Sequence, residues 1–383
     1  MKALHITALW ILIIACNSDS KIKERQFCIS NALFKEFRLS EITEQITYIP
    51  LDSEILFGGV LRVELTDNNI IIGPNGESIL NYNWKGKFLN KIGARGRGPG
   101  EYQFSWIFTI DSEKDIVYIY DNHKIIVYKL NGELLEELST NQFGEMFHDV
   151  YYNEGKIYLG RNLNLGQARY HWLIIDTLGN QISYKHNSIP SFKTGFRGKG
   201  GFIKAPDELY YWNEFNDTIF LLSEKGYQPF IFFGQDEYRK PHDDISLENL
   251  RNYINLDRIF AIKDFFIIKY IFGEYTYISL IDKNDGSVNI INKNKETFIG
   301  YAPGITNDID CGPDFNPLFY SSVYGKEFLI TWINAYQLIA HVESEAFKNS
   351  TPKFPEKKKE LEELAASLNA NDNPVLMLVN IKE

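Results

Sequence analysis

The sequence predicts a six-bladed β-propeller, because two short patterns recur along it at the spacing typical of propeller blades. The first pattern is a glycine between two apolar runs, with successive copies 46, 47, 47 and 60 residues apart. Such a glycine, preceded by Asn or Asp in two copies, supplies the positive φ angle of a tight hairpin turn. We expect each copy to join the third and fourth strands of a blade. The glycines are Gly86, Gly132, Gly179, Gly226 and Gly286.

The second pattern is a run of β-branched and aromatic residues that follows a polar turn, which is a strand signal. It occurs six times, so we expect six blades, with each run forming the second strand of its blade. The runs are residues 70–72, 116–120, 157–159, 209–212, 265–268 and 328–332.

The two ends of the chain are expected to meet in the last blade. The C-terminal strand at residues 374–381 leaves that blade one strand short, whereas a spare strand at residues 46–51 precedes the first blade. Pairing these strands closes the ring and removes two exposed sheet edges. The predicted fold is therefore an all-β propeller closed by an N-terminal strand.

Two helical stretches are expected to interrupt the last blade, at about residues 335–370. In each stretch, apolar residues recur at helical spacing and so share one face. They are Ile339, Val342 and Ala346 in the first stretch and Leu361, Leu364 and Leu368 in the second.

The N-terminus has the pattern of an export signal. Lys2 precedes an apolar stretch, residues 3–14, that is too short to span a bilayer with ease. It ends in Ile13-Ile14-Ala15-Cys16, which resembles the bacterial lipobox, in which the cysteine is lipidated and becomes the first residue. An ordinary cleaved signal peptide is the alternative.

These signals divide the chain into a lipoprotein signal peptide (1–15), a lipidated N-terminus and tether (16–40) and the propeller (41–383). We expect a monomer in the cell envelope, held by its lipid at the outer membrane and facing the periplasm or the cell surface. Two cysteines remain after Cys16, namely Cys28 and Cys311. An exported protein can form a disulfide, but we expect two unpaired thiols.

The formal net charge of −10 argues against a nucleic-acid-binding protein, which would carry a basic surface. The glycine-rich segment at residues 93–100 is not a phosphate-binding P-loop. It lacks the Lys-Ser/Thr pair and contains Pro99. We interpret it as the crossover from the first blade to the second.

Three stretches resemble the six-bladed β-propeller lipoproteins of gut-dwelling Gram-negative bacteria. They are IGARGRGPGEY at 92–102, TNDIDCGPDF at 306–315 and DNPVLMLV at 372–379. The resemblance covers almost the whole mature chain, with Cys311 standing where such proteins more often have a small residue. It implies the fold and export, but no established activity and no catalytic residues.

The arginines suggest a binding face. Eight of the eleven fall in predicted links that lie at one end of a propeller, and loops on a rigid scaffold often carry binding sites. All but Arg251 are candidate ligand-binding residues, because a guanidinium suits carboxylate, sulfate or phosphate. The alternative is that they keep the loops soluble. The eight are Arg95, Arg97, Arg161, Arg169, Arg197, Arg239, Arg251 and Arg258.

Other polar and aromatic residues carry weaker signals. Asp308, Asp310 and Asp314 could hold calcium through alternating carboxylates, although aspartate-rich turns are common and the closing glutamate of a calcium loop is absent. No other cofactor is expected. His148-Asp149 could form an inward pair at the start of the third blade. Trp212 and Tyr301 could stack on a sugar, or could simply pack.

Two kinds of function fit these observations. The first is a non-catalytic recognition module for a glycan, peptide or envelope protein, including anionic ligands such as an acidic glycan, with membrane contact through its lipid alone. The alternative, by analogy of fold only, is a metal-dependent enzyme of the lactonase or lyase type. A structural component of an envelope complex would instead show a large apolar patch.

Overall fold

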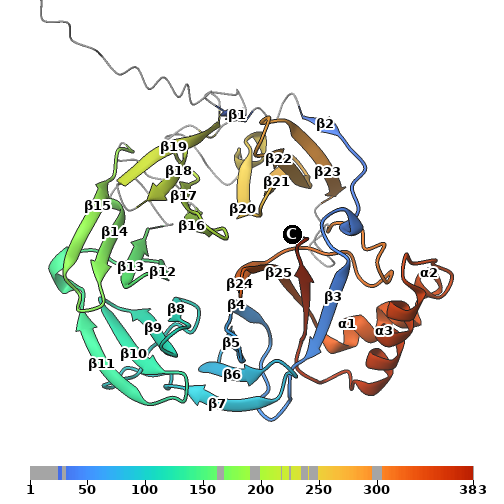
Figure 1. Cartoon of the computed structure of the whole chain (residues 1–383), viewed down its shortest axis with the longest axis horizontal. Helices are drawn as coiled ribbons and strands as arrows, with labels where there is room; N and C mark the ends of the chain where they lie inside the picture. The colour runs from blue at the N-terminus through green and yellow to red at the C-terminus, as the bar shows by residue number, and fades with distance from the viewer. Residues whose placement is uncertain are drawn as a thin grey trace, which may run out of the picture.

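The computed structural model consists of six antiparallel sheets arranged around a central axis, which confirms the predicted six-bladed β-propeller (Figure 1). It describes residues 25–27, 32–161, 168–189, 199–216, 218–223, 226–233, 240, 249–295 and 304–382. In the first five blades the chain runs from the axis outward. The first of the four consecutive strands of each of these blades is therefore the innermost one.

The first three blades each contain four consecutive strands. The first blade comprises β4 (Val60–Leu65), β5 (Asn69–Pro74), β6 (Ile79–Asn83) and β7 (Phe88–Ile92). The second comprises β8 (Phe108–Asp111), β9 (Ile116–Asp121), β10 (Lys124–Lys129) and β11 (Leu134–Ser139). The third comprises β12 (Asp149–Asn153), β13 (Lys156–Gly160), β14 (Tyr170–Asp176) and β15 (Gln181–His186).

The fourth and fifth blades each gain a short outer strand from the N-terminal segment. The fourth comprises β16 (Gly200–Lys204), β17 (Leu209–Asn213), β18 (Thr218–Ser223) and β19 (Gly226–Phe233). The fifth comprises β20 (Asn255–Ala261), β21 (Phe265–Phe272), β22 (Tyr275–Asp282) and β23 (Val288–Lys295). The strands β1 (Arg25–Phe27) and β2 (Leu33–Phe34) pair in parallel with β19 and β23 and cover their outer edges.

The sixth blade is built from both ends of the chain, as predicted. It comprises β24 (Phe319–Val323), β25 (Lys326–Ile333), β26 (Val375–Asn380) and β3 (Gln45–Pro50). The pairing of β26 with β3 is antiparallel and continuous, from Val375 opposite Pro50 to Asn380 opposite Gln45. Three short 3₁₀ helices, η2 (Leu39–Glu41), η3 (Asn141–Phe143) and η4 (Leu250–Asn252), complete the links of the described residues.

Six hydrophobic clusters lie between neighbouring blades, one for each pair, and a seventh packs the helices of the last blade against its sheet. Because successive side chains of a strand point to opposite faces, one strand serves two clusters. In β5, Ile70 and Ile72 pack against the sixth blade, whereas Ile71 packs against the second. Burial of both faces therefore explains the continuous apolar runs in the sequence.

The insertion between β25 and β26 forms three helices on the outer side of the sixth blade, α1 (Ala335–Glu343), α2 (Glu345–Lys348) and α3 (Pro355–Ser367) (Figure 1). The prediction of which residues form the apolar face of the first stretch is wrong in part. Ser344 ends α1 and caps α2 by accepting a hydrogen bond from the Phe347 amide at 3.1 Å. Ala346 is therefore exposed, and Phe347 is buried in its place.

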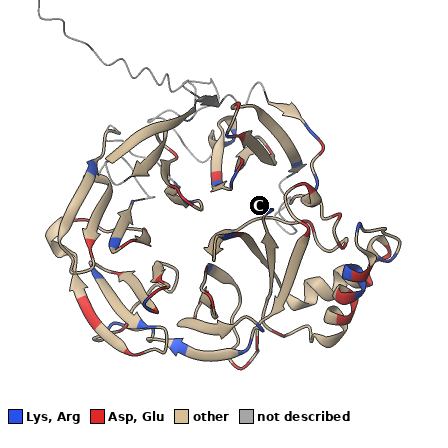
Figure 2. Cartoon of the chain, viewed as in Figure 1, with Lys and Arg blue, Asp and Glu red and all other residues tan. Residues whose placement is uncertain are grey.

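Charged residues of both signs gather on α3, whose solvent-facing side they cover (Figure 2). In the second stretch Leu361 is buried as expected, with Ala365 beside it. No helix in the described part of the chain is long and apolar enough to span a membrane.

A buried histidine lies between the third and fourth blades. His171 in β14 is fully buried, and its ring lies 5.9 Å from that of Tyr211 in β17. Burial, with a smaller contribution from the nearby Lys185, lowers the pKa of His171 to about 4. The imidazole is therefore neutral in the folded protein at neutral pH.

This histidine should make the protein sensitive to acid. Below about pH 6.5 the unfolded chain binds a proton at His171, whereas the folded protein binds it only near pH 4. The free energy of unfolding therefore falls as the pH decreases through that range. The free energy of unfolding should lose about 3 kcal/mol between about pH 7.5 and about pH 4 from this group. His171→Phe should abolish that part of the pH dependence, measured by urea unfolding at both pH values. A pH dependence that survives unchanged in His171→Phe would contradict this expectation.

Candidate ligand-binding cavity on the propeller axis

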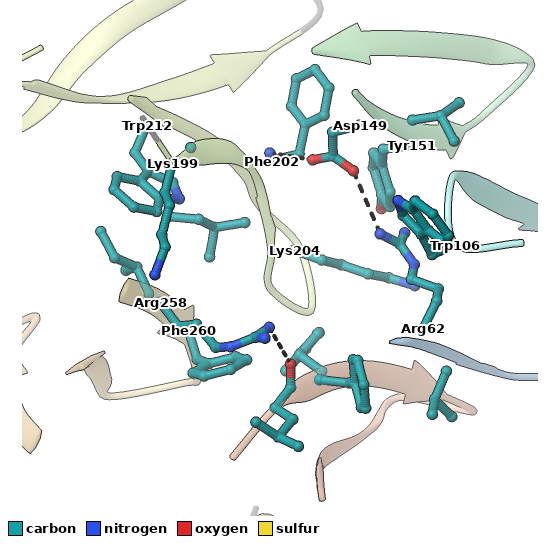
Figure 3. Close-up of a pocket in the computed structure, with 18 of the residues that line it drawn as sticks. Arg62, Trp106, Asp149, Tyr151, Lys199, Phe202, Lys204, Trp212, Arg258 and Phe260 are labelled. Carbon is teal, nitrogen blue, oxygen red and sulfur yellow. Dashed lines mark hydrogen bonds and ion pairs between the residues drawn. The ribbon is translucent and has the colours of Figure 1, made fainter. Parts of the chain in front are cut away.

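A cavity of about 500 Å³ lies on the axis, where the innermost strands converge (Figure 3). All six blades contribute to its wall, through β4, Trp106 just before β8, β12, β16, β20 and the start of β24. Its volume lies within the range of about 300–1,000 Å³ that is usual for small-molecule sites. The lining extends along the innermost strands, for example from Lys199 just before β16 to Lys204 at its end.

Arg62 is the most constrained cation of the wall. Its Nε and Nη2 donate to Oε1 of Glu64 at 3.0 and 2.7 Å, and its Nη1 donates to Oδ1 of Asp149 at 3.4 Å. Burial alone would lower the pKa of Arg62, but the two carboxylates outweigh it and raise that pKa. Asp149 also accepts a hydrogen bond from the Phe202 amide at 2.8 Å. This network ties together the first, third and fourth blades.

A second ion pair lies at the start of β16. Lys199 pairs with Asp257 of β20, and the other carboxylate oxygen of Asp257 lies 3.6 Å from Nζ of Lys269. Burial favours protonation of Asp257, but the ammonium groups of Lys199 and Lys269, with a smaller contribution from the charge of Arg258, outweigh it and lower its pKa. The Asp257 carboxylate is therefore ionised and its charge is compensated.

Two further cations of the wall have no carboxylate partner among the described residues. Nζ of Lys204 lies 5.6 Å from the centre of the Tyr151 ring, and no Asp or Glu oxygen lies within 4.0 Å of it. Nη1 of Arg258 donates to the Leu318 carbonyl at 3.0 Å, and among the described residues its guanidinium donates to no carboxylate. Lys204 and Arg258 can therefore bind an anion without breaking an existing ion pair.

Aromatic side chains supply the apolar part of the wall. Trp106 is 38% exposed and packs against Phe104, with ring centres 4.9 Å apart. Trp212, which the sequence suggested for stacking or for packing, lines the cavity but is only 5% exposed. Tyr301 lies outside the described residues. Trp106 is therefore the indole that offers an accessible face.

The structure disperses most of the predicted arginines. Arg258 lines the cavity, although it lies within β20 rather than in a link. The amide of Arg95 donates to Ser78 Oγ at 3.2 Å and its Nε to the Gln103 carbonyl, while Arg97 is exposed in the same link. These two positions lie outside the cavity wall.

Three further predicted arginines lie outside the cavity wall, and two lie outside the described residues. Arg161 Nη1 donates to Oε2 of Glu145 at 3.2 Å, and the Arg169 guanidinium lies 5.1 Å from the Tyr170 ring. Arg251 is exposed in η4. Arg197 and Arg239 lie outside the described residues.

Arg62, Lys199 and Lys204 were not predicted from the sequence as site residues. Alternation along β4 places Arg62 and Glu64 on the same face, and this was the signal available for them. For Lys199 and Lys204, the register of β16 had to be known first. His148 and Asp149 both line the cavity, but Asp149 pairs with Arg62.

The aspartates proposed for calcium are engaged in loop hydrogen bonds. Asp308 accepts from the amide and hydroxyl of Ser40, at 3.0 and 2.7 Å. Asp310 is buried and accepts from Asn307 and from the Gly312 amide, whereas Asp314 is exposed. In the part of the chain that the structure describes, no three His, Cys, Asp or Glu side chains form a group suited to a metal ion.

Of the cysteines, Cys311 carries a free thiol, and its carbonyl lies 2.9 Å from Nε2 of His341 in α1. Cys16 and Cys28 lie outside the described residues, so the structure does not test lipidation or a disulfide.

Together these features define a six-bladed β-propeller with a charged, aromatic-lined cavity on its axis. The chain belongs to the family described as a domain of unknown function (DUF4934), whose sequence profile matches residues 26–380. No curated protein matches the sequence.

Solved structures match this chain over most of its length. A Bacteroides fragilis protein, named as an inferred exported protein, has a TM-score of 0.64 and 18% identity, covering 94% of this chain and 99% of its own. A Bacteroides vulgatus member of the DUF4221 family has a TM-score of 0.47 and 10% identity, covering 89% of this chain and 97% of its own. Virginiamycin B lyase from Staphylococcus aureus has a TM-score of 0.44 and 14% identity, and the match covers 74% of this chain and 81% of the lyase. The last two scores are too low to support an argument from likeness.

Proposed function

We propose that this protein is an exported, lipid-anchored propeller of the cell envelope that recognises an anionic ligand in its axial cavity without transforming it. The observation that carries the proposal is the pair Lys204 and Arg258, two cations that line one cavity and have no carboxylate partner among the described residues. An ion in such a cavity is held more strongly than on the open surface, because the surrounding protein excludes much of the water.

The ligand is a glycan, a peptide or a segment of an envelope protein that presents an anionic group. A cavity of about 500 Å³ can enclose only a few sugar units or side chains, so it would hold the end of a larger molecule or a small free ligand. The exposed Trp106 supplies a flat apolar surface beside the cations. Such a surface suits a ring better than it suits an inorganic ion.

Export and lipidation are supported by the sequence of the N-terminus. A short apolar stretch ends in Ile13-Ile14-Ala15-Cys16, the pattern of a lipoprotein signal. The Bacteroides fragilis protein of the same fold is also named for export. These observations support export, and we propose that the lipid holds the protein at the outer membrane, with the cavity facing the periplasm or the cell exterior. Mass spectrometry of the mature N-terminus tests this placement, since lipidation requires a diacylglyceryl-modified Cys16.

The proposed binding can be tested by thermal shift with acidic and neutral oligosaccharides and acidic peptides. A ligand that binds only the folded protein raises its melting temperature as the ligand concentration rises. We expect acidic members alone to do so, with an effect that weakens as salt is added. Lys204→Met and Arg258→Met should each weaken binding about tenfold or more, the value of a hydrogen bond to a charged group.

Lys85→Met makes the same charge change in the exposed turn before Gly86, outside the cavity, and should leave binding unchanged. Equal binding by all three variants would refute the proposed site. A melting temperature that falls with EDTA and recovers with calcium would instead favour the metal-dependent enzyme.

A further inference from the structure

We infer that the anionic group recognised in the cavity is a carboxylate carried directly on a sugar ring, so that the ligand is a uronate residue whose carboxylate binds Lys204 and whose ring packs on Trp106. This inference rests on the proposed function and names the ligand class of the same site.

The relevant surface is one side of the cavity, formed by Arg62, Trp106, Tyr151 and Lys204, and is called here the Trp106 wall. Figure 3 shows Trp106 and Tyr151 next to Arg62, with the Lys204 side chain extending from β16 toward them. An exposed aromatic face and an ammonium group without a carboxylate partner thus lie on the same wall. A cyclic ligand with one anionic substituent can use both at once.

An unused hydrogen-bond acceptor of Glu64, which lines the cavity beside Arg62, favours a ligand with hydroxyl groups. Oε1 of Glu64 accepts both hydrogen bonds from Arg62, whereas Oε2 accepts none from the described residues. A carboxylate oxygen at the edge of a cavity is a strong acceptor for a sugar hydroxyl. A purely anionic or apolar ligand would leave this acceptor unused.

The charges of the cavity favour a monoanion. Three carboxylates line it, those of Glu64, Asp149 and Asp257, and they already compensate Arg62 and Lys199. A phosphate ester carries nearly two negative charges and would meet about twice the repulsion from these carboxylates. A single carboxylate pairs with Lys204 and meets less repulsion.

The position of Lys204 favours an anion close to the ring. Its ammonium lies 5.6 Å from the centre of the Tyr151 ring, and Tyr151 adjoins Trp106 in the wall. A carboxylate bonded to the sugar ring lies nearer to the ring than a sulfate or phosphate on the exocyclic carbon. Arg62 uses its three guanidinium nitrogens on Glu64 and Asp149, so it offers no free fork for a tetrahedral anion.

The test compares methyl glycosides that differ only at C6, in the gluco, galacto and manno series. Each is offered to the mature protein as the uronate, the neutral sugar, the 6-sulfate and the 6-phosphate, and dissociation constants are measured by isothermal titration calorimetry. In at least one series the uronate should bind about tenfold or more tightly than its neutral, sulfated and phosphorylated counterparts.

The variants separate the two contacts. Lys204→Met should remove the preference for the uronate over the neutral sugar while leaving the neutral sugar's affinity within about twofold. Trp106→Ala should weaken both ligands about fivefold and preserve their ratio. Lys85→Met is the control that should change neither value.

A sulfate or phosphate ester that binds as tightly as the uronate would overturn the inference, as would a uronate preference that survives in Lys204→Met. Absence of uronate binding in all three series would overturn it as well. In each of these cases the proposed function still stands if acidic ligands raise the melting temperature in a manner that depends on Lys204 and Arg258.

Discussion

Replacing Gly86 with alanine is expected to lower the free energy of unfolding by more than about 4 kcal/mol, a loss that few single substitutions reach. Gly86 has a φ of +76°, and a Cβ there would lie 2.0 Å from the carbonyl oxygen of Pro50. Pro50 ends β3, the strand that closes the ring, and the Gly86 carbonyl accepts a hydrogen bond from the Asp52 amide at 2.8 Å. Alanine would therefore push the closing strand away from the first blade.

Gly286 is the matched control for this substitution. It occupies the equivalent turn of the fifth blade with a φ of +75°, but no atom lies within 4 Å of the position of its Cβ. Gly286→Ala should therefore cost only about 1–2 kcal/mol, the strain of a left-handed alanine. Urea unfolding of the two variants measures the difference. Equal losses would show that the approach to Pro50 is unimportant.

The second large effect is expected at Asn373, a buried residue just before β26. Its Nδ2 donates to the carbonyls of Asp52 and Ile55, each at 2.7 Å, and its Oδ1 accepts from the Phe57 amide at 3.1 Å. Asn373→Ala leaves three backbone groups without their partner. Each such loss costs about 1–3 kcal/mol, so we expect a total of about 3 kcal/mol or more.

Asn369 provides the comparison in the same segment. It is exposed, and its side chain contacts only Asp372, at 3.5 Å. Asn369→Ala should change the free energy of unfolding by less than about 0.5 kcal/mol. Both variants are compared by urea unfolding. If Asn373→Ala were as mild as Asn369→Ala, water would have to replace the lost amide, and the segment would be less closed than it is in the structure.

Gly86 and Asn373 show which structural roles can be predicted from the sequence alone and which cannot. The turn glycine was recognisable because its conformational requirement is local and repeats in each blade. The motif around Asn373 was recognisable only as a resemblance. Its role depends on residues 52–57, which are more than three hundred positions away in the chain.

The candidate site shows the same division. Arg258 was among the candidates because the sequence placed it in a link at one end of the propeller, whereas it lies within β20 and still lines the cavity. The ion pair of Arg62 with Asp149 joins residues that are 87 positions apart, in the first and third blades. Lys204 lines the same cavity from the fourth blade. Neither composition nor local spacing contains that information.

The sequence by itself determined the number of blades, the order of their strands and the closure by the N-terminal strand, because hairpin turns and strand runs are short-range signals that recur in every blade. The tertiary structure alone decided which charged side chains meet at the axis. The reason is that a shift of one residue in a strand turns every side chain to the opposite face, and that register is set by packing against the neighbouring blades.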